Sequence, residues 1–147
     1  MSQSKLKIDN ESLAEDFFQD TLLLGIVAPI KDYTLTWHIN QVMGFQFRVN
    51  TSLEMHLLKK KRHYFFPIYE YPVPGCFSAH YLYNNHNDGE YLLPEFKHLD
   101  FLWLAKGEDL DKEGFKLIQQ TIRTIPAVQL VTEMTNEKIK NKQHLIF

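Results

Sequence analysis

The chain has 147 residues, of which 44% are hydrophobic and 23% charged, and its formal net charge is −2. This length suits one domain spanning residues 1–147, and so small a charge excludes a global field that would attract nucleic acid or an anionic membrane. The single cysteine, Cys76, excludes an internal disulfide and fits a reducing compartment.

The first twenty residues do not resemble a secretion signal, because they are polar and mixed in charge and contain no apolar stretch. The longest apolar run, residues 22–29, is interrupted by a glycine and is too short to cross a bilayer. We therefore expect a cytoplasmic protein with no membrane partner. Residues 1–20 are expected to form a loosely held arm, with Leu6 and Ile8 in a short edge strand and Phe17 and Phe18 packed against the body.

Residues 22–28 are apolar at every position, which is typical of a central strand covered on both faces. A helix is predicted next, because Leu35 and Ile39 fall on one helical stripe, with Asp32 suited to its start and Gly44 to its end. Alternating side chains after Gly44, up to Val49, then predict a strand with one buried and one solvent-facing side.

The middle of the chain is predicted to form an antiparallel meander. Alternation continues over residues 53–57, and another strand is predicted over residues 64–71. The charged sequence Lys59-Lys60-Lys61-Arg62 forms the turn between them, and Pro67 favours an edge position or a bulge in the second strand.

A further strand is predicted over residues 77–83, with Phe77, Tyr81 and Tyr83 in phase. It is followed by a loop over residues 84–89 that is rich in Asn, Asp and Gly and closes a hairpin.

The last third of the chain has the same shape as the first. Residues 101–105 are again apolar throughout, so they predict a second central strand beside the first. A helix capped by Asp109 or Asp111 and a strand over residues 127–133 follow, and residues 145–147 are expected to dock on the core. The whole pattern predicts an α+β fold: a mainly antiparallel sheet, two helices packed on one face, and a split β-α-β, ferredoxin-like order with an inserted strand meander.

One short stretch resembles a family signature. Residues 92–101 read Leu-Leu-Pro-Glu-Phe-Lys-His-Leu-Asp-Phe, which is similar to the signature of the IPExxxVDY family. Pro94, Glu95 and Asp100 match the signature at the right spacing, while Phe101 replaces its tyrosine.

A second stretch is also similar to that family. Residues 31–33, which read Lys-Asp-Tyr, are followed by Trp37 and Asn40 as in the family's first helix. The family consists of small bacterial proteins with no assigned function, so the resemblance implies a bacterial source but no activity.

Glu95 and Asp100 are the first candidates for chemistry, because two carboxylates can divide acid and base roles if their pKa values differ. On a continuous helix, a spacing of five residues would place them about 140° apart, so they could meet only if the chain bends. In the structural alternative, Glu95 favours the positive end of a short helix started by Pro94, and Asp100 accepts backbone N–H bonds at the entry to a strand. We favour the structural alternative.

The seven histidines show no metal-binding spacing, and one cysteine cannot form a zinc motif, so we expect neither a metal nor a cofactor. Surface or rim positions are expected for all seven, and His80 is expected to face away from the aromatic residues of its strand. Cys76 lacks a cationic neighbour or a helix N-terminus that would make it a nucleophile. Phosphate-binding loops, dinucleotide fingerprints and nucleophile elbows do not occur in the sequence.

Four residues are candidates for binding: Trp37, Asn40, Tyr81 and Tyr83. Trp37 lies two positions from Leu35 and therefore faces away from the main stripe of its helix, where it marks either an interface or the edge of the core. The chain contains 11 Phe, 7 Tyr and 2 Trp. Such a composition indicates a sheet-rich core or an aromatic-lined pocket.

The leading hypothesis is a non-enzymatic binding or protein-interaction module that forms a homodimer, with an unidentified protein or small molecule as further partner. The alternative is a small enzyme in which Glu95 and Asp100 act as acid and base. A minor alternative is binding of single-stranded nucleic acid through the turn from Lys59 to Arg62, which precedes three aromatic residues. We do not expect nucleic acid, because the domain is slightly acidic and a solvated turn explains the basic run.

Overall fold

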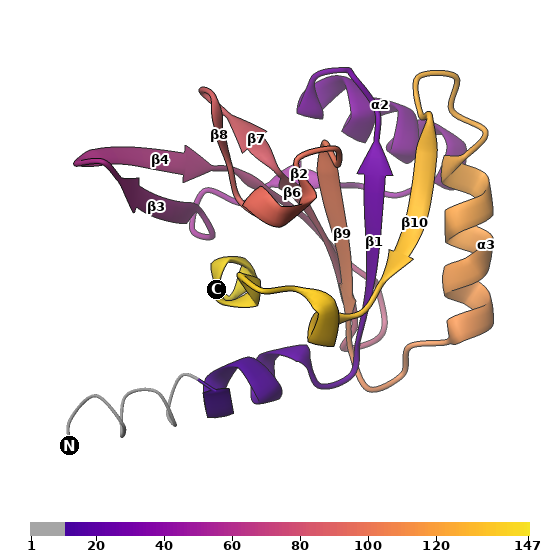
Figure 1. Cartoon of the computed structure of the whole chain (residues 1–147). Helices are drawn as coiled ribbons and strands as arrows, with labels where there is room; N and C mark the ends of the chain where they lie inside the picture. Colours follow the sequence, from indigo (N-terminus) through magenta and orange to yellow (C-terminus); the bar gives the residue numbers. More distant parts are fainter. Residues whose placement is uncertain (1–10) are drawn as a thin grey trace.

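The computed structural model describes residues 11–147 and contains one six-stranded sheet with two small hairpins beside it (Figure 1). From edge to edge, the strands of the main sheet are β10 (Leu130–Met134), β1 (Thr21–Val27), β9 (Phe101–Lys106), β6 (Ala79–Asn84), β5 (Ile68–Pro72) and β2 (Arg48–Val49). All neighbouring pairs run antiparallel. The predicted α+β class with a mainly antiparallel sheet is therefore confirmed.

The remaining elements lie around this sheet. The hairpins pair β3 (Met55–Lys59) with β4 (Arg62–Phe66), and β7 (His86–Asn87) with β8 (Glu90–Tyr91). Residues 11–18 are helical, and the longer helices are α2 (Asp32–Met43) and α3 (Lys112–Ile122). Short 3-10 helices are η1 (Pro94–Phe96), η2 (Asn136–Lys138) and η3 (Lys142–Leu145). None of the helices within residues 11–147 combines the length and apolarity needed to cross a bilayer.

The two apolar runs form neighbouring central strands, as predicted. β1 pairs with β9 from Thr21 opposite Lys106 to Ile26 opposite Phe101, and β10 and β6 lie on their outer sides. All side chains of β9 from Phe101 to Ala105 are buried. Because both faces of these strands are covered, their sequences show no alternation of apolar and polar residues.

Buried side chains form two clusters, and alternate residues of β9 belong to one or the other, so the clusters lie on opposite faces of the sheet. The first cluster receives side chains from α2 and α3, namely Leu35, Ile39, Phe115 and Ile122. The second receives side chains from residues 11–18, the segment before β9 and the C-terminal segment, namely Phe17, Phe18, Leu92, Leu99, Ile139 and Leu145. The predicted docking of the C-terminal residues is confirmed, because Leu145 is fully buried.

The helix ends follow the local signals in part. Asp111 caps α3, since its Oδ1 accepts a hydrogen bond from the backbone N of Glu113 at 3.0 Å. Gly44 ends α2 with a φ of 67°. The prediction that Asp32 caps α2 is wrong, because Lys31 is the N-cap and Asp32 is the first helical residue. There the negative charge of Asp32 still favours the positive end of the helix.

The N-terminal arm is more ordered than predicted over its second half. Residues 11–18 are helical, and Phe17 and Phe18 are buried as expected. Two adjacent aromatic side chains bury a large apolar area, which holds this helix on the body. The edge strand predicted for Leu6 and Ile8 lies outside the described residues.

The strand predicted after α2 is reduced to the two residues of β2. Asn40 explains this, because its Oδ1 accepts from the backbone N of Phe47 at 2.9 Å and its Nδ2 donates to the Phe47 carbonyl at 3.3 Å. The backbone groups of Phe47 are therefore bonded to a side chain and do not join a ladder.

Phe77 is not part of the strand predicted over residues 77–83. β6 begins at Ala79, after a turn in which the backbone N of Val73 donates to the Ser78 carbonyl at 3.0 Å. The Phe77 side chain on this turn is fully exposed, so it is not in phase with Tyr81 and Tyr83.

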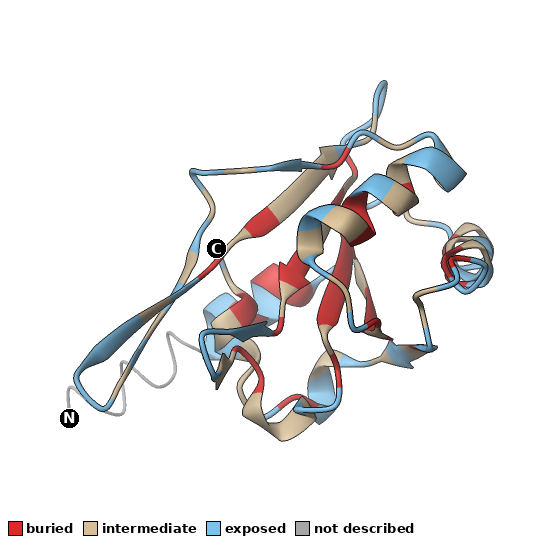
Figure 2. Ribbon diagram, turned by 90° about the horizontal axis from the view of Figure 1, so that it is seen from above, coloured by how far each residue is buried: buried red, intermediate tan, exposed pale blue. Residues whose placement is uncertain are grey.

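Pro67 divides the strand predicted over residues 64–71. Before Pro67, β4 pairs with β3, and after it, β5 joins the main sheet. A proline has no N–H group with which to continue a ladder. The β3–β4 hairpin consequently projects from the body as a separate ribbon, and exposed or half-buried residues make up most of it (Figure 1, Figure 2).

Candidate functional site

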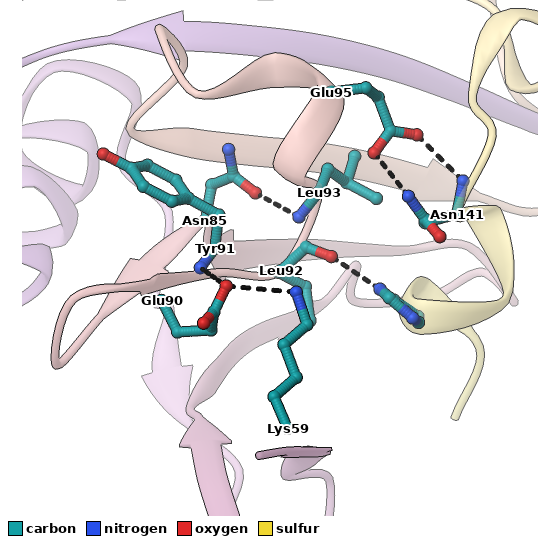
Figure 3. Close-up of polar contacts among 9 residues, drawn as sticks. Lys59, Asn85, Glu90, Tyr91, Leu92, Leu93, Glu95 and Asn141 are labelled. Carbon is teal, nitrogen blue, oxygen red and sulfur yellow. Dashed lines mark hydrogen bonds and ion pairs between the residues drawn. The ribbon is translucent and has the colours of Figure 1, made fainter.

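Glu95 binds the C-terminal segment. It follows Pro94 in η1, and its two carboxylate oxygens accept from the backbone N and from Nδ2 of Asn141, both at 2.8 Å (Figure 3). Partial burial raises the pKa of the Glu95 carboxyl, but the hydrogen bonds from Asn141 outweigh it and leave this pKa below its ordinary value. Both oxygens are thus used to hold Asn141 against η1.

Asp100 binds a different segment. Its Oδ2 accepts from the backbone N of Ala28 at 2.8 Å, and its own backbone N donates to the Ile26 carbonyl at 2.8 Å. Asp100 therefore joins the start of β9 to the end of β1. Among residues 11–147, Glu95 and Asp100 have no hydrogen-bond partner in common.

Asn85, which no sequence pattern marks as a functional residue, holds the loop between these carboxylates. Its side chain is fully buried, and Nδ2 donates to the carbonyls of Phe96 and Leu99, both at 2.9 Å. Its Oδ1 accepts from the backbone N of Leu93 at 2.7 Å, the bond drawn in Figure 3. The Leu99 carbonyl and the Leu93 N–H would otherwise be buried without partners, whereas the Phe96 carbonyl also accepts from the backbone N of Leu99 at 3.0 Å. In the sequence, Asn85 lies among other Asn and Asp residues of a predicted loop, so composition does not distinguish it from its neighbours.

Asp100 also lines a polar hollow of about 220 Å³. Asp32 at the start of α2, Asn84 at the end of β6, and His86 lie around the same hollow. The Nδ2 of Asn84 donates to Oδ2 of Asp32 at 2.9 Å. The two stretches that resemble the IPExxxVDY family, residues 31–33 and 92–101, therefore meet here.

Tyr81 lines a larger hollow of about 700 Å³ near the start of β6. Burial, together with the charge of and a hydrogen bond to Glu70, raises the pKa of Tyr81 to about 12. Lys106 also lines this hollow, and its Nζ donates to the carbonyl of Phe17 and lies 4.4 Å from the centroid of that ring. Half of the other lining residues are acidic, namely Asp16, Asp20, Glu108 and Asp109, and the rest are Gln19, Phe77, Ala79 and Gly107.

The other predicted binding residues divide into structural and exposed ones. Asn40 bonds the backbone of Phe47, as described above. Tyr83 is buried, and its hydroxyl donates to the Leu145 carbonyl at 2.7 Å. Trp37 is 59% exposed and contacts His38 edge to face at 5.1 Å between ring centroids. Of these three, only Trp37 is free to meet a partner.

The prediction of a surface or rim position is wrong for His80. Its side chain is buried, its ring stacks on Phe45 at 5.3 Å between centroids, and its Nδ1 accepts from Nε1 of Trp103 at 3.0 Å. Burial lowers the pKa of His80 to about 4, so the ring is neutral at physiological pH. The aromatic residues around it come from other strands and from the loop after α2, which period-two alternation along one strand does not reveal.

The tip of the β3–β4 hairpin is held by the β7–β8 hairpin. Lys59 forms an ion pair with Glu90 at 3.0 Å, and Arg62 forms one with Asp88 (Figure 3 shows the first of these). Beyond them, Lys60 and Lys61 make the turn with positive φ angles of 52° and 66°. Two of the four basic side chains are thus neutralised, which weakens any attraction of this turn for nucleic acid.

The outward face of the β3–β4 hairpin consists of four exposed side chains, His56, Leu58, His63 and Phe65. Alternation places them together, since His56 lies opposite Phe65 and Leu58 opposite His63. The rings of His56 and Phe65 are nearly parallel, with centroids 4.7 Å apart. Asp, Glu, Lys and Arg are absent from this face within the two strands.

Within residues 11–147, no three or more His, Cys, Asp or Glu side chains gather in a way that could hold a metal ion. Comparisons of the chain with protein-family models, with curated proteins and with solved structures found no match. Function must therefore be inferred from the geometry of this chain alone.

Proposed function

We propose that this protein is a non-enzymatic protein-interaction module that self-associates, and that two copies meet through the outward face of the β3–β4 hairpin. One observation carries the proposal. On that face, Leu58 and Phe65 are 62% and 49% exposed. The two side chains beside them are histidines, so the face carries no Asp, Glu, Lys or Arg within the two strands. Interface centres are rich in aromatic residues and poor in charge.

The hairpin presents this face in a fixed position. Met55, Leu57 and Tyr64 on its inner face pack against the second cluster, and the ion pairs at Lys59 and Arg62 hold its tip. An isolated two-stranded hairpin would be marginal in water, so these attachments keep the ribbon formed. A surface that is ordered before it binds loses less conformational entropy on association.

Two other surfaces are less suited to self-association. The open edge of β10 is partly covered, because Nη2 of Arg123 donates to the Val131 carbonyl at 2.9 Å, and a covered edge resists strand pairing. On α2, Tyr33 and Trp37 are exposed one turn apart, and the Trp37 ring packs edge to face on the polar ring of His38.

Sedimentation velocity over a concentration series tests the proposal. We expect the wild-type mass to rise from one chain toward two, with an association in the micromolar range, because the apolar part of the face is small. Leu58→Glu and Phe65→Glu should each abolish the rise. The matched control is Leu117→Glu on α3, where the leucine is 63% exposed but lies far from the hairpin in the fold. A monomer at every concentration, or loss of association in the control alone, would contradict the proposal.

A small enzyme is the second candidate function. The 220 Å³ hollow is a better candidate for its active site than the pair of Glu95 and Asp100. Asp100 and Asp32 line this hollow with His86, each carboxylate being held in place by a hydrogen bond from the chain. Active sites store unfavourable electrostatics, so removing a catalytic carboxylate often stabilises a protein. Thermal melts of Asp32→Asn and Asp100→Asn would support an enzyme if both variants melt higher than the wild type, and would count against it if both melt lower.

Two further inferences concern the fold type and the family of this chain. We infer that the fold is a variant of the ferredoxin-like order. This inference is supported by the strand order, in which β9 and β10, connected through α3, lie on either side of β1, and β6 lies on the far side of β9. Membership of the IPExxxVDY family stays a prediction. It is supported by the roles of Pro94, Glu95 and Asp100 at one loop.

A further inference from the structure

His56 and His63 meet on the outward face of the β3–β4 hairpin. They are diagonal neighbours across the two strands, and such neighbours are within reach of long and aromatic side chains. Nε2 of His56 and Nδ1 of His63 lie 2.5 Å apart, while the ring planes differ by 13° and the centroids lie 4.7 Å apart. With the centroids 4.7 Å apart, two nitrogens can come this close only if the nearly parallel rings meet edge to edge rather than face to face.

This arrangement directs two nitrogen atoms at one point in space. Two N–H groups cannot face each other, so at least one of the two nitrogens has no proton and offers its lone pair. Neutral imidazole is the commonest metal ligand in proteins and binds through either ring nitrogen. Both rings are exposed, so a metal ion can reach them from solvent.

The pair fits a tetrahedral zinc ion after a small movement. Zinc–nitrogen bonds of about 2.0–2.1 Å at a tetrahedral angle separate two ligand nitrogens by roughly 3.3 Å. The His56 and His63 nitrogens, now 2.5 Å apart, would have to separate by less than 1 Å, which rotation of two exposed side chains allows. One chain, however, supplies two ligands, and a closed zinc site needs four.

We propose that one Zn²⁺ ion binds between two copies of this chain, with His56 and His63 of each copy as its four ligands. The inference rests on the self-association proposed above and names what regulates it. A two-fold axis through the ion would bring the two outward faces together, so that Leu58 and Phe65 of each chain pack around the metal. The site is incomplete in one chain, which agrees with the lack of any three-ligand group within the described residues.

The test uses tag-free full-length chain stripped with EDTA, with ZnCl₂ as the probe. Calorimetric titration should give one Zn²⁺ per two chains. At a chain concentration low enough for the metal-free chain to be monomeric, light scattering should show the mass doubling on zinc addition and reverting with EDTA. His56→Gln and His63→Gln should each weaken zinc binding at least about tenfold, because each chain loses one of its two ligands. The matched control, His98→Gln, removes an exposed histidine outside the hairpin and should bind zinc as the wild type does.

The outcomes separate this inference from the proposed function. Any of three results would overturn the metal site: zinc binding that His63→Gln does not weaken, a stoichiometry of one ion per chain without a change in mass, or no zinc binding at all. If the metal-free chain still dimerises and Leu58→Glu prevents it, the proposed interface stands without the metal. If Leu58→Glu leaves both metal-free and zinc-bound association unchanged, the hairpin interface itself is wrong.

Discussion

Acidification should destabilise this protein through His80, because the buried ring must stay neutral. Nδ1 of His80 accepts from Nε1 of Trp103, so a proton on Nδ1 would break that hydrogen bond. The pKa of His80 is about 4 in the folded chain, against 6.5 for a free histidine. Between these values the unfolded chain binds the proton more tightly, so stability falls as the pH drops through this window and is unaffected above it.

The size of the effect follows from the two pKa values. A difference of about 2.5 pKa units corresponds to roughly 3 kcal/mol of unfolding free energy once both states are protonated, at about 1.4 kcal/mol per unit. At about pH 5 the loss is already roughly 2 kcal/mol, because the unfolded chain is almost fully protonated at His80 while the folded chain is not.

Urea unfolding followed by tryptophan fluorescence at about pH 7 and about pH 5 measures this loss. Carboxylates also titrate at the acid end, so the comparison is with His80→Gln, whose side-chain oxygen can still accept from Trp103 but does not titrate. The wild type should lose roughly 2 kcal/mol more than this variant between the two pH values. An equal loss in both proteins would refute the reasoning, and His98→Gln, at an exposed position, should behave as the wild type.

Two further predictions concern the loop before β9. Asn85→Ala should destabilise the protein by roughly 3 kcal/mol, because it leaves the buried Leu99 carbonyl and the buried Leu93 N–H without partners. Asn87→Ala, at an exposed position of the β7–β8 hairpin, should cost under about 1 kcal/mol in the same urea assay. Glu95→Gln should cost about 1–2 kcal/mol, because one of the two acceptors for Asn141 is replaced by a donor. A higher melting temperature for Glu95→Gln would contradict its structural role.

The sequence was sufficient for features that depend on local patterns. Residues 22–28 and 101–105 could be recognised as central strands because a strand covered on both faces is apolar at every position. Asp111 at the start of α3 and Gly44 at the end of α2 were likewise recognisable, since caps depend on the nearest backbone groups. The stop at Pro67 was visible as a weak point of its strand, although not as the boundary between two sheets.

The candidate site depends on contacts between distant segments, which a single sequence does not encode in a readable pattern. Glu95 and Asn141 are 46 positions apart. Glu95 lies in the three-residue η1 and Asn141 just before the four-residue η3, and both helices are too short to show a periodicity. The pair of His56 and His63 is an exception. Once the turn from Lys59 to Arg62 is taken as a hairpin tip, strand register places the two histidines on one face, so this pair could have been found from sequence.

The central claim is that two chains meet through the outward face of the β3–β4 hairpin. An isotope-filtered NOE experiment tests it most directly, using an equal mixture of labelled and unlabelled chain at a concentration where the dimer predominates. We expect intermolecular NOEs that link Leu58 of one chain to Phe65 of the other. Intermolecular NOEs that arise instead from Tyr33 and Trp37 on α2, with none from the hairpin, would contradict it.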